Sequence, residues 1–294
     1  MRADDTIGIA IATHNSEKQI GGCLAALGAA AFRVVIYDDA SQDHTVVQAR
    51  RVRPSVDIID GTGDAWWGGG TRRAIDRCLA LGCEYVLMLN PDAWIDADSV
   101  RLLRDTVASD GNTIAAAVVV RRDDPQLVAW AGSRWVSSPL GVPLIRRQNY
   151  LYRAGTPVAH LPGVPFATHE VHGRAVMVSS DTFRKVGPLD DRTFPHYGCD
   201  NDFAWRAHRA GVRMVVVPSA VVLLDTSNSG MASRTRGRLR DRLRRAHRYL
   251  TDKKSGDAIR VTWRLYSRHH AWYSVLPSVA RELAAGMYHR LWTR

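Results

Sequence analysis

The chain has 294 residues, of which 46% are hydrophobic and 23% are charged. This composition excludes a largely disordered chain and can fill the core of one large domain or two small ones. The formal charge of +11 is uneven, because residues 234–294 hold 16 Lys and Arg against 4 Asp and Glu, whereas residues 1–233 hold 24 against 25. The basic character therefore belongs to the C-terminal segment alone.

The first 120 residues alternate between short apolar runs and helix-compatible stretches. The apolar runs are 6–12, 32–38, 56–60, 85–90 and 113–120, and the helical stretches are 16–29, 43–51, 69–82 and 98–109. Apolar runs that do not alternate with polar residues are typical of strands buried on both faces. The sequence therefore predicts an α/β fold with a mostly parallel, doubly wound sheet flanked by helices.

Residues 121–170 break this rhythm with six prolines and predict an irregular or hairpin-rich region, of a length that often contacts substrate. A second ordered block follows, with a strand at 171–178, helices at 180–186 and 201–211, and strands at 213–217 and 220–224. From residue 233 onward, Leu239, Leu243, Ala246 and Leu250 fall on one face of an Arg-rich helix. We expect one α/β domain over 1–232 and a basic amphipathic helical tail over 233–294.

Two further features bear on location. The longest apolar runs are far shorter than the roughly 18–20 residues that cross a bilayer, and the N-terminus lacks the basic region of a secretory signal. The four cysteines show neither a Cys-x-x-Cys pair nor a zinc-finger spacing, which favours free thiols in a reducing compartment. We expect a cytoplasmic protein, with peripheral attachment to the inner face of the cell membrane left open.

Polar residues follow the predicted strands at their carboxyl ends, where open α/β sheets bind ligands. They are Thr13 and Asn15, then Asp38 and Asp39, then Asn90 and Asp92. The first strand is not followed by Gly-x-Gly-x-x-Gly, which argues against a dinucleotide-dependent oxidoreductase. Carboxylates at two strand ends suit a nucleoside diphosphate, one contacting the base or ribose and the other holding a divalent cation on the phosphates. Asp92 is the candidate Mg²⁺ or Mn²⁺ ligand, and a turn aspartate that caps the next helix is the alternative.

Six segments resemble family 2 of the inverting glycosyltransferases, and most closely its bacterial rhamnosyltransferase-like branch. They cover residues 6–225 in the order and spacing of that family: IAIATHN (9–15), VVIYDDASQDHT (34–45), GTGDAWWGGGTRRAI (61–75), YVLMLNPD (85–92), HGRAVMVSSDTFRKVGPLDD (172–191) and FPHYGCDNDFAWRAHRAG (194–211). The resemblance implies a GT-A type, Rossmann-like catalytic domain over 1–232. It also implies transfer of a rhamnose-like or related sugar from a dTDP- or UDP-sugar to a hydroxyl of a cell-envelope glycan or lipid-linked acceptor.

The resemblance also implies roles for individual residues. Asp38 and Asp39 would contact the base and ribose, Asn90-Pro91-Asp92 would stand for the Asp-x-Asp metal motif, and Asp200 would be the general base. The donor-binding residues would be Thr13, Asn15, Asp38, Asp39, Asp64, Trp67, Gly68, Gly69, Arg72 and Asn90. On the acceptor side we expect His172, His196 and Asp202, the last positioning the acceptor or capping its helix.

Two positions depart from the family pattern. Cys199 precedes Asp200 where a Glu or Gly is usual, which keeps the proposed base. Many relatives carry a metal-binding His after the last strand, where only Asp225 could take its place here. Arg72 is expected to open a helix, where a cation opposes the helix dipole, so a phosphate partner would explain it.

Several alternatives stay open. Trp66 and Trp67 beside three glycines favour a ligand pocket over ordinary core aromatics. The tail, whose aromatic residues lie among arginines, could be a docked helical extension, an anchor on an anionic membrane or a nucleic-acid patch, and the last lacks any recognition motif. A non-catalytic nucleotide-binding protein recruited through its tail is the second function class, and a homodimer is left open.

Overall fold

The computed structural model describes residues 3–137, 146–225 and 259–292, together with the isolated positions 240, 244 and 247. The first half contains η1 (Ala3–Thr6), β1 (Ile7–Thr13), α1 (Glu17–Ala26), β2 (Arg33–Asp38), α2 (Thr45–Val52), β3 (Asp57–Asp60), α3 (Trp66–Ala80), β4 (Tyr85–Leu89), β5 (Ala93–Ile95), α4 (Ala97–Ala108), β6 (Thr113–Arg121) and β7 (Asp124–Trp130). The second half contains β8 (Ser133–Ser137), β9 (Arg146–Tyr150), η2 (Val158–His160), β10 (Phe166–Ala167), β11 (Ala175–Ser179), α5 (Ser180–Val186), α6 (Cys199–Arg209), β12 (Arg213–Leu224), α8 (Ile259–His269) and α9 (Trp272–Trp292).

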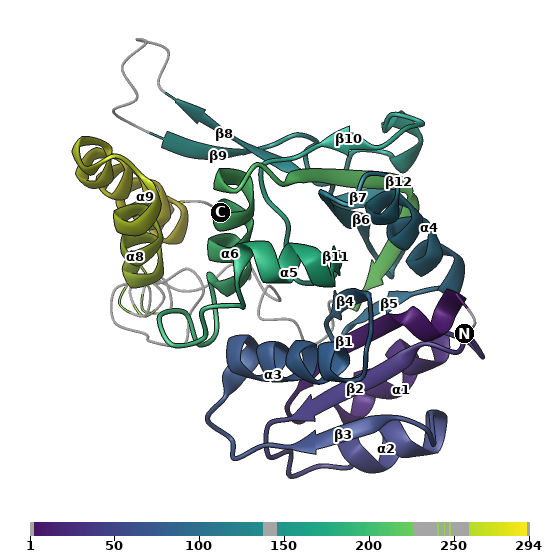
Figure 1. Ribbon diagram of the computed structural model, residues 1–294. Coiled ribbons are helices and arrows are strands. Elements are labelled where there is room, and N and C mark those ends of the chain that lie inside the picture. The colour runs from purple at the N-terminus through teal and green to yellow at the C-terminus, as the bar shows by residue number, and fades with distance from the viewer. Residues whose placement is uncertain are drawn as a thin grey trace.

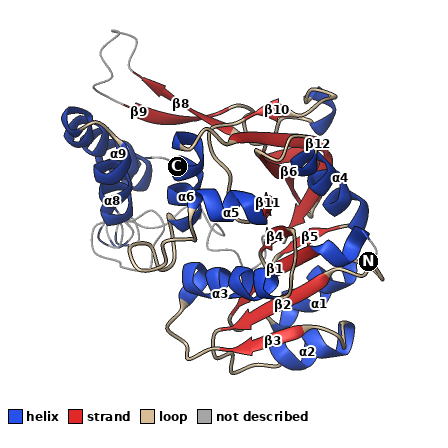
Figure 2. Ribbon diagram, in the orientation of Figure 1, coloured by secondary structure: helices blue, strands red, loops and turns tan. Residues whose placement is uncertain are grey.

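One mixed sheet runs through the molecule in the order β10-β12-β6-β11-β4-β1-β2-β3, with helices on both faces (Figures 1 and 2). Strands β1, β2, β3 and β4 are parallel neighbours, and β12 runs parallel to β6. Strand β11 lies antiparallel between β4 and β6. The prediction of a mostly parallel α/β sheet with flanking helices is confirmed.

The core follows from the apolar runs. All seven residues of β1 are buried, and Ile7, Ile9 and Ile11 on one face are as inaccessible as Ala10 on the other. A strand enclosed on both faces needs no polar alternation, because helices cover both sides of the sheet. The described helices include none long and apolar enough to serve as a transmembrane span.

Several elements differ from expectation, and the strand expected at 171–178 begins only at Ala175, as β11. The two strands expected at 213–217 and 220–224 form one strand, β12, whose register against β6 shifts between Val217 and Val221. Helix α3 begins at Trp66 rather than at residue 69. The short strand β5 was not predicted; it pairs antiparallel with the end of β12, a partner more than 120 residues away that local sequence does not reveal.

The C-terminal helix α8 packs against α6, and α9 packs against α8 and β9 (Figure 1). Gly198, which precedes α6, has φ +86°, and a Cβ there would lie 2.9 Å from Cγ1 of Val261 in α8. The predicted boundary at 232/233 and most of the predicted basic helix over 233–250 lie outside the described residues.

Candidate active site

The carboxyl ends of the parallel strands meet at one edge of the sheet, as the strand order requires. Thr13 at the end of β1 is the register partner of Asp38 at the end of β2, and Asp38 is in turn the partner of Asp60 in β3. Asn90 follows β4, whose Leu89 pairs with Ile11. The structure therefore brings these polar residues together at one edge of the sheet. Within the described chain, the buried hydroxyl of Thr13 has no hydrogen-bond partner.

The two aspartates after β2 organise the loops of this edge. Oδ1 of Asp39 accepts the backbone N–H of Gly63 at 2.9 Å, and Oδ2 accepts that of Trp66 at 2.8 Å. Asp38 accepts both the backbone N–H of Ser41, at 3.0 Å, and its hydroxyl. Asp39 thus holds the start of α3, a role that sequence reasoning missed, and only its remaining lone pairs are available to a donor nucleotide.

Three non-glycine residues with positive φ occur in the described chain, and all three lie at this edge: Asn15 (50°), Ala40 (56°) and Trp66 (57°). Left-handed backbone costs a non-glycine residue on the order of 1 kcal/mol or more and clusters at functional sites. The side chain of Asn15 accepts the N–H of Gln42, and its own N–H donates to Ser41, so the β1 and β2 loops are joined.

Trp67 connects the donor edge to the predicted acceptor side. Its indole Nε1 donates to Oδ1 of Asn90 at 2.8 Å. Its ring lies against Gly173, where a Cβ would be 2.2 Å from Cζ2 of the indole. The backbone N–H of Gly173 donates in turn to Oδ2 of Asp200 at 3.2 Å. The strand tip after β4 and the predicted general base are therefore linked through Trp67 and Gly173.

Asp200 sits in the first turn of α6, with its side chain 18% exposed. Nδ1 of His172 is 3.9 Å from Oδ2 of Asp200. Burial lowers the pKa of His172 below its ordinary value, although the carboxylate of Asp200 acts in the opposite direction. The carboxylate of Asp200 also accepts the N–H of Asn201 at 2.9 Å, so it has two backbone N–H groups and a largely neutral imidazole beside it, and it stays partly exposed.

The residues around Asp92 fit a hard divalent cation. Its Oδ1 is buried and makes no hydrogen bond within the described chain, although burial and the nearby Asp225 raise the pKa of this carboxyl. The N–H of Asp225 donates to the carbonyl of Asp92 at 2.9 Å, and Arg122 is 3.5 Å from the carboxylate of Asp225. The described chain brings no group of three His, Cys, Asp or Glu side chains together for a metal. Two carboxylates completed by substrate phosphates are the arrangement in which Mg²⁺ is usually held.

Arg174 is a functional candidate that sequence reasoning missed. Its positive charge acts on two of the predicted site residues, because it opposes the increase in the pKa of Asp92 and contributes to the lowered pKa of His172. Its position within the 172–191 segment was available from the sequence. Nothing in that segment, however, distinguished this arginine from Arg184, whose side chain is 72% exposed.

The glycines of α3 serve packing within the chain. A Cβ on Gly68 would lie 2.7 Å from the carbonyl oxygen of Phe194, and one on Gly70 would lie 2.9 Å from Cβ of Ala12. The N–H of Gly68 already donates to Pro195 at 2.8 Å. Gly69 is close to Arg73 and Asp191. In the structure these glycines allow other parts of the protein to pack closely against α3. Direct contact of Gly68 and Gly69 with a donor remains a prediction.

Two other predicted residues lie near this region. Asp64 is exposed and accepts the hydroxyl of Thr62 at 2.5 Å. The ring of His196 is 5.4 Å from that of Trp66 and 4.1 Å from that of Tyr197. Donor contact by Asp64 and acceptor contact by His196 remain predictions.

The reasoning behind Arg72 is wrong. Because α3 starts at Trp66, Arg72 lies in its second turn and does not face the open helix N-terminus. Its Nη1 is 2.6 Å from Oδ1 of Asp191, and Asp76 is 3.7 Å from its Nε. Arg72 also lines a recess of about 480 Å³ between α3 and α5, which contains none of the strand-end residues. Its charge therefore has a partner in the protein, and no phosphate is needed to explain it.

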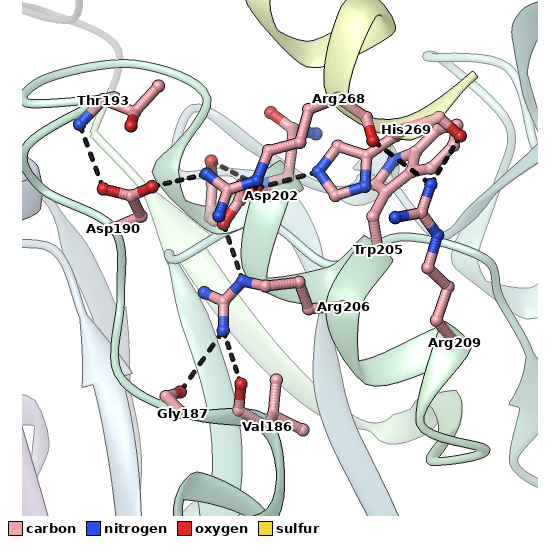
Figure 3. A network of polar contacts seen from close by, with 12 residues as sticks. Val186, Gly187, Asp190, Thr193, Asp202, Trp205, Arg206, Arg209, Arg268 and His269 are labelled. Carbon is pink, nitrogen blue, oxygen red and sulfur yellow. Dashed lines mark hydrogen bonds and ion pairs between the residues drawn. The ribbon is translucent and has the colours of Figure 1, made fainter. Parts of the chain in front are cut away.

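The expectation that Asp202 positions an acceptor or caps its helix is also wrong (Figure 3). Its carboxylate is fully buried, and no side-chain bond caps the N-terminus of α6. Oδ2 accepts Nε of Arg206 at 2.8 Å, and Oδ1 lies 2.8 Å from Nε2 of His269 in α8. Asp200 and Asp202 are two residues apart on a helix and so point to different sides, one toward the site and one toward the C-terminal helices.

The comparison with known families agrees with this geometry. Residues 8–174 match the family described as Glycosyl transferase family 2. The chain belongs to this family. The match covers β1 to the loop before β11, and so includes the strand ends, Trp67, Asn90 and Gly173, whereas Asp200 lies beyond it.

Among curated relatives of this family 2 member is the low-salt glycan biosynthesis hexosyltransferase Agl10 of Haloferax volcanii. It is 24% identical over 220 residues, which are 71% of this chain and 64% of that protein. The alignment thus spans less than two thirds of the relative.

Solved structures establish the fold of this family 2 chain. GalNAc-T7 with UDP, GalNAc and Mn²⁺ superposes with a TM-score of 0.56 at 12% identity, over 95% of this chain and 57% of that one. The mannosyltransferase PcManGT from Pyrobaculum calidifontis, in complex with GDP-Man and Mn²⁺, superposes with a TM-score of 0.51 at 17% identity, over 95% and 74%. The fold is therefore that of the GT-A glycosyltransferases.

Proposed function

We propose that the protein is an inverting glycosyltransferase that moves a hexose from a nucleoside diphosphate sugar to an acceptor hydroxyl. The proposal depends most on one observation: Trp67 joins Asn90, beside the predicted metal ligand, to Gly173, whose N–H holds Asp200. A carboxylate on the acceptor side has no purpose in a protein that only binds nucleotides. Membership of family 2 and the nucleotide-sugar complexes of the structural neighbours support the same reaction.

The donor would bind along the carboxyl edge of β1, β2 and β4, with its base and ribose toward the loops held by Asp38 and Asp39. Asp92 would hold the divalent cation with Asp225 as the second carboxylate, and the charge of Arg174 acts on the carboxyl of Asp92. When bound, such a cation neutralises the charge that develops on the leaving nucleoside diphosphate. Neighbouring structures contain Mn²⁺, and Mg²⁺ has the same preference for oxygen ligands.

Asp200 would act as the general base. Its carboxylate takes the proton of the acceptor hydroxyl while that oxygen bonds to the anomeric carbon from the face opposite the leaving group. The bond from the anomeric carbon to the phosphate oxygen breaks, and its electron pair leaves with the diphosphate. A single displacement of this kind inverts the anomeric configuration. The N–H groups of Gly173 and Asn201 would keep Asp200 oriented, and the neutral His172 beside it adds no positive charge at the base.

For the substrates we propose a rhamnose-like or related sugar carried by dTDP or UDP, and a hydroxyl of a cell-envelope glycan or lipid-linked carrier. The support is the rhamnosyltransferase-like resemblance of the six segments within residues 6–225 and the name of the Haloferax relative, a hexosyltransferase of low-salt glycan biosynthesis.

The test is a donor panel of dTDP-, UDP- and GDP-sugars with wild-type protein, Asp200→Asn and the control Asp123→Asn. Asp123 lies in the turn between β6 and β7, with its side chain 60% exposed. We expect Asp200→Asn to keep donor affinity and to lower transfer by about 10²-fold or more, and the control to match wild type. Transfer by Asp200→Asn at the wild-type rate would contradict the role of the base.

A further inference from the structure

Helix α9 is apolar on both of its faces. Between residues 272 and 288 the only charged side chains are Arg281 and Glu282, and these two pair with each other. One face is covered, since Val275 and Val279 are 7% and 9% exposed and pack with Tyr266 of α8. A helix that is apolar all round is normally covered all round.

The opposite face of α9 lies open to solvent. Trp272, Leu276 and Tyr288 are 86%, 67% and 61% exposed, and Ala280 and Ala284 between them are exposed as well. These five residues recur at every fourth position, so they form one stripe along the helix, which we name the outer face of α9. Contiguous exposed apolar surface of this kind marks an interaction site.

We propose that the outer face of α9 inserts into the surface of an anionic phospholipid bilayer. The composition of this part of the chain is complementary to such a surface: Arg260 and Arg264 of the neighbouring helix α8 are exposed, and in the sequence residues 234–294 hold 16 Lys and Arg against 4 Asp and Glu. Each basic residue near an anionic surface adds about 1 kcal/mol of attraction, and an apolar face with aromatic residues adds a part that salt does not screen.

A second copy of the chain is the competing occupant, and charge argues against it. A symmetric dimer formed through α9 would bring together two copies of residues 259–292, which hold 5 Arg against 1 Glu. Like charges at close range raise the free energy of such a dimer, whereas anionic headgroups lower the free energy of the bound state. The bilayer is therefore the occupant that fits both the apolar face and its basic surroundings.

The docking of α8 on α6 gives this surface a fixed relation to the site. Arg268 contacts both Asp190 and Asp202, and Arg264 donates to the carbonyl of Thr193 at 3.0 Å. Contact of α9 with a bilayer would thus hold the N-terminus of α6, and Asp200 with it, at a set distance from the membrane. The suggestion that a lipid-linked acceptor reaches Asp200 in this way rests on the proposed function. The proposal that α9 binds a membrane does not depend on it.

The test compares full-length wild type with Trp272→Gln/Leu276→Gln in co-sedimentation with vesicles of equal parts phosphatidylglycerol and phosphatidylcholine. Neither substitution changes charge, and both side chains are mostly exposed, so we expect the fold to persist. The matched control is Val47→Gln/Val52→Gln on α2, where the valines are 61% and 39% exposed. We expect the α9 variant to bind roughly tenfold or more weakly and the control to bind as wild type.

Two further measurements complete the test. A fluorophore on Leu276→Cys should shift to shorter wavelength with these vesicles and not with phosphatidylcholine alone. Donor hydrolysis should be equal in wild type and the α9 variant, so vesicle binding without any hydrolysis would reject the proposed function and leave the membrane surface standing. Equal vesicle binding by wild type and the α9 variant would overturn the inference. So would a wild-type dimer that ignores vesicles and dissociates in the α9 variant.

Discussion

Nε2 of His269 lies 2.8 Å from Oδ1 of Asp202, and the two side chains are 1% and 0% exposed. They come from α8 and α6, 67 residues apart, and Arg206 and Arg268 complete the surroundings of the carboxylate. A buried carboxylate is tolerated only when its lone pairs are satisfied, so α8 is a necessary part of the environment of α6.

Substitution of His269 should therefore destabilise the whole domain. We expect His269→Ala to lower the free energy of unfolding by about 3 kcal/mol, because it leaves a buried carboxylate short of one partner. Chemical denaturation followed by circular dichroism measures this. His160→Ala, at an exposed histidine of η2, should differ from wild type by about 0.5 kcal/mol or less. If the two variants had the same free energy of unfolding, the contact between His269 and Asp202 would make no net contribution to stability.

Acid should weaken the same junction. Burial opposes ionisation of Asp190, but hydrogen bonds from Arg268 and Thr193 outweigh it and lower its pKa to about 2; bonds from His269 and Arg206 likewise hold the pKa of Asp202 below its ordinary value. A lowered native pKa stabilises the fold above the unfolded value of about 3.9, and this contribution is lost as pH falls through the native pKa. We expect the free energy of unfolding to fall between about pH 4 and pH 2. The loss should be smaller in Asp190→Asn, and identical pH curves would contradict the assignment.

Removal of the predicted cation ligand should abolish most activity without unfolding the protein. We expect Asp92→Ala to lower transfer by about 10²-fold or more at saturating Mg²⁺ or Mn²⁺, because charge on the leaving diphosphate is no longer neutralised. Asp225→Asn should keep more activity and require more metal. Calorimetry of donor binding with and without metal gives a second readout. Full turnover of Asp92→Ala in the presence of chelator would rule out this metal site.

The contact between Trp67 and Gly173 should be sensitive to one methyl group. In Gly173→Ala the new Cβ would lie 2.2 Å from the indole, so Trp67 must move and its bond to Asn90 is lost. We expect kcat to fall at least tenfold, with a loss of about 1–3 kcal/mol in stability from overpacking. Gly163→Ala is the control, since no atom lies within 4 Å of its added Cβ. A Gly173→Ala enzyme with wild-type kcat would show that Trp67 does not organise the site.

The longer strands of the first 120 residues could be predicted because helices cover both faces of the sheet. A strand buried in this way is an apolar run without polar alternation, and such runs are visible in the sequence. Strand β5 has no such pattern. Its three residues form a strand because they pair with Val222 to Leu224, which come much later in the chain. The same limit applies to the site. The strand-end residues were found from the positions of their strands, whereas Arg174 has no local signature and becomes visible only beside Asp92.

Asp200 and Asp202 illustrate why roles are harder to predict than positions. Both are acidic and both lie in the first turn of α6, so the sequence analysis assigned both to the acceptor side. Their roles can be distinguished only when α8 is in place. His269 of α8 contacts the buried carboxylate of Asp202, whereas Asp200 stays partly exposed. The charge of the C-terminal segment was evident from its composition, but the packing of α8 against α6 was not.

The bonds from Asp39 to the backbone at Gly63 and Trp66, and from Asn15 to the loop at Gln42, have a consequence for the rate at which a donor binds. These loops are tied to one another through protein groups alone, so their ordering entropy is lost when the chain folds and not again when a ligand arrives. A nucleotide that reaches this edge meets a surface already in its final shape. Its association should therefore proceed at the speed of diffusion and orientation, in a single kinetic phase, with discrimination between donors residing in how slowly each one leaves.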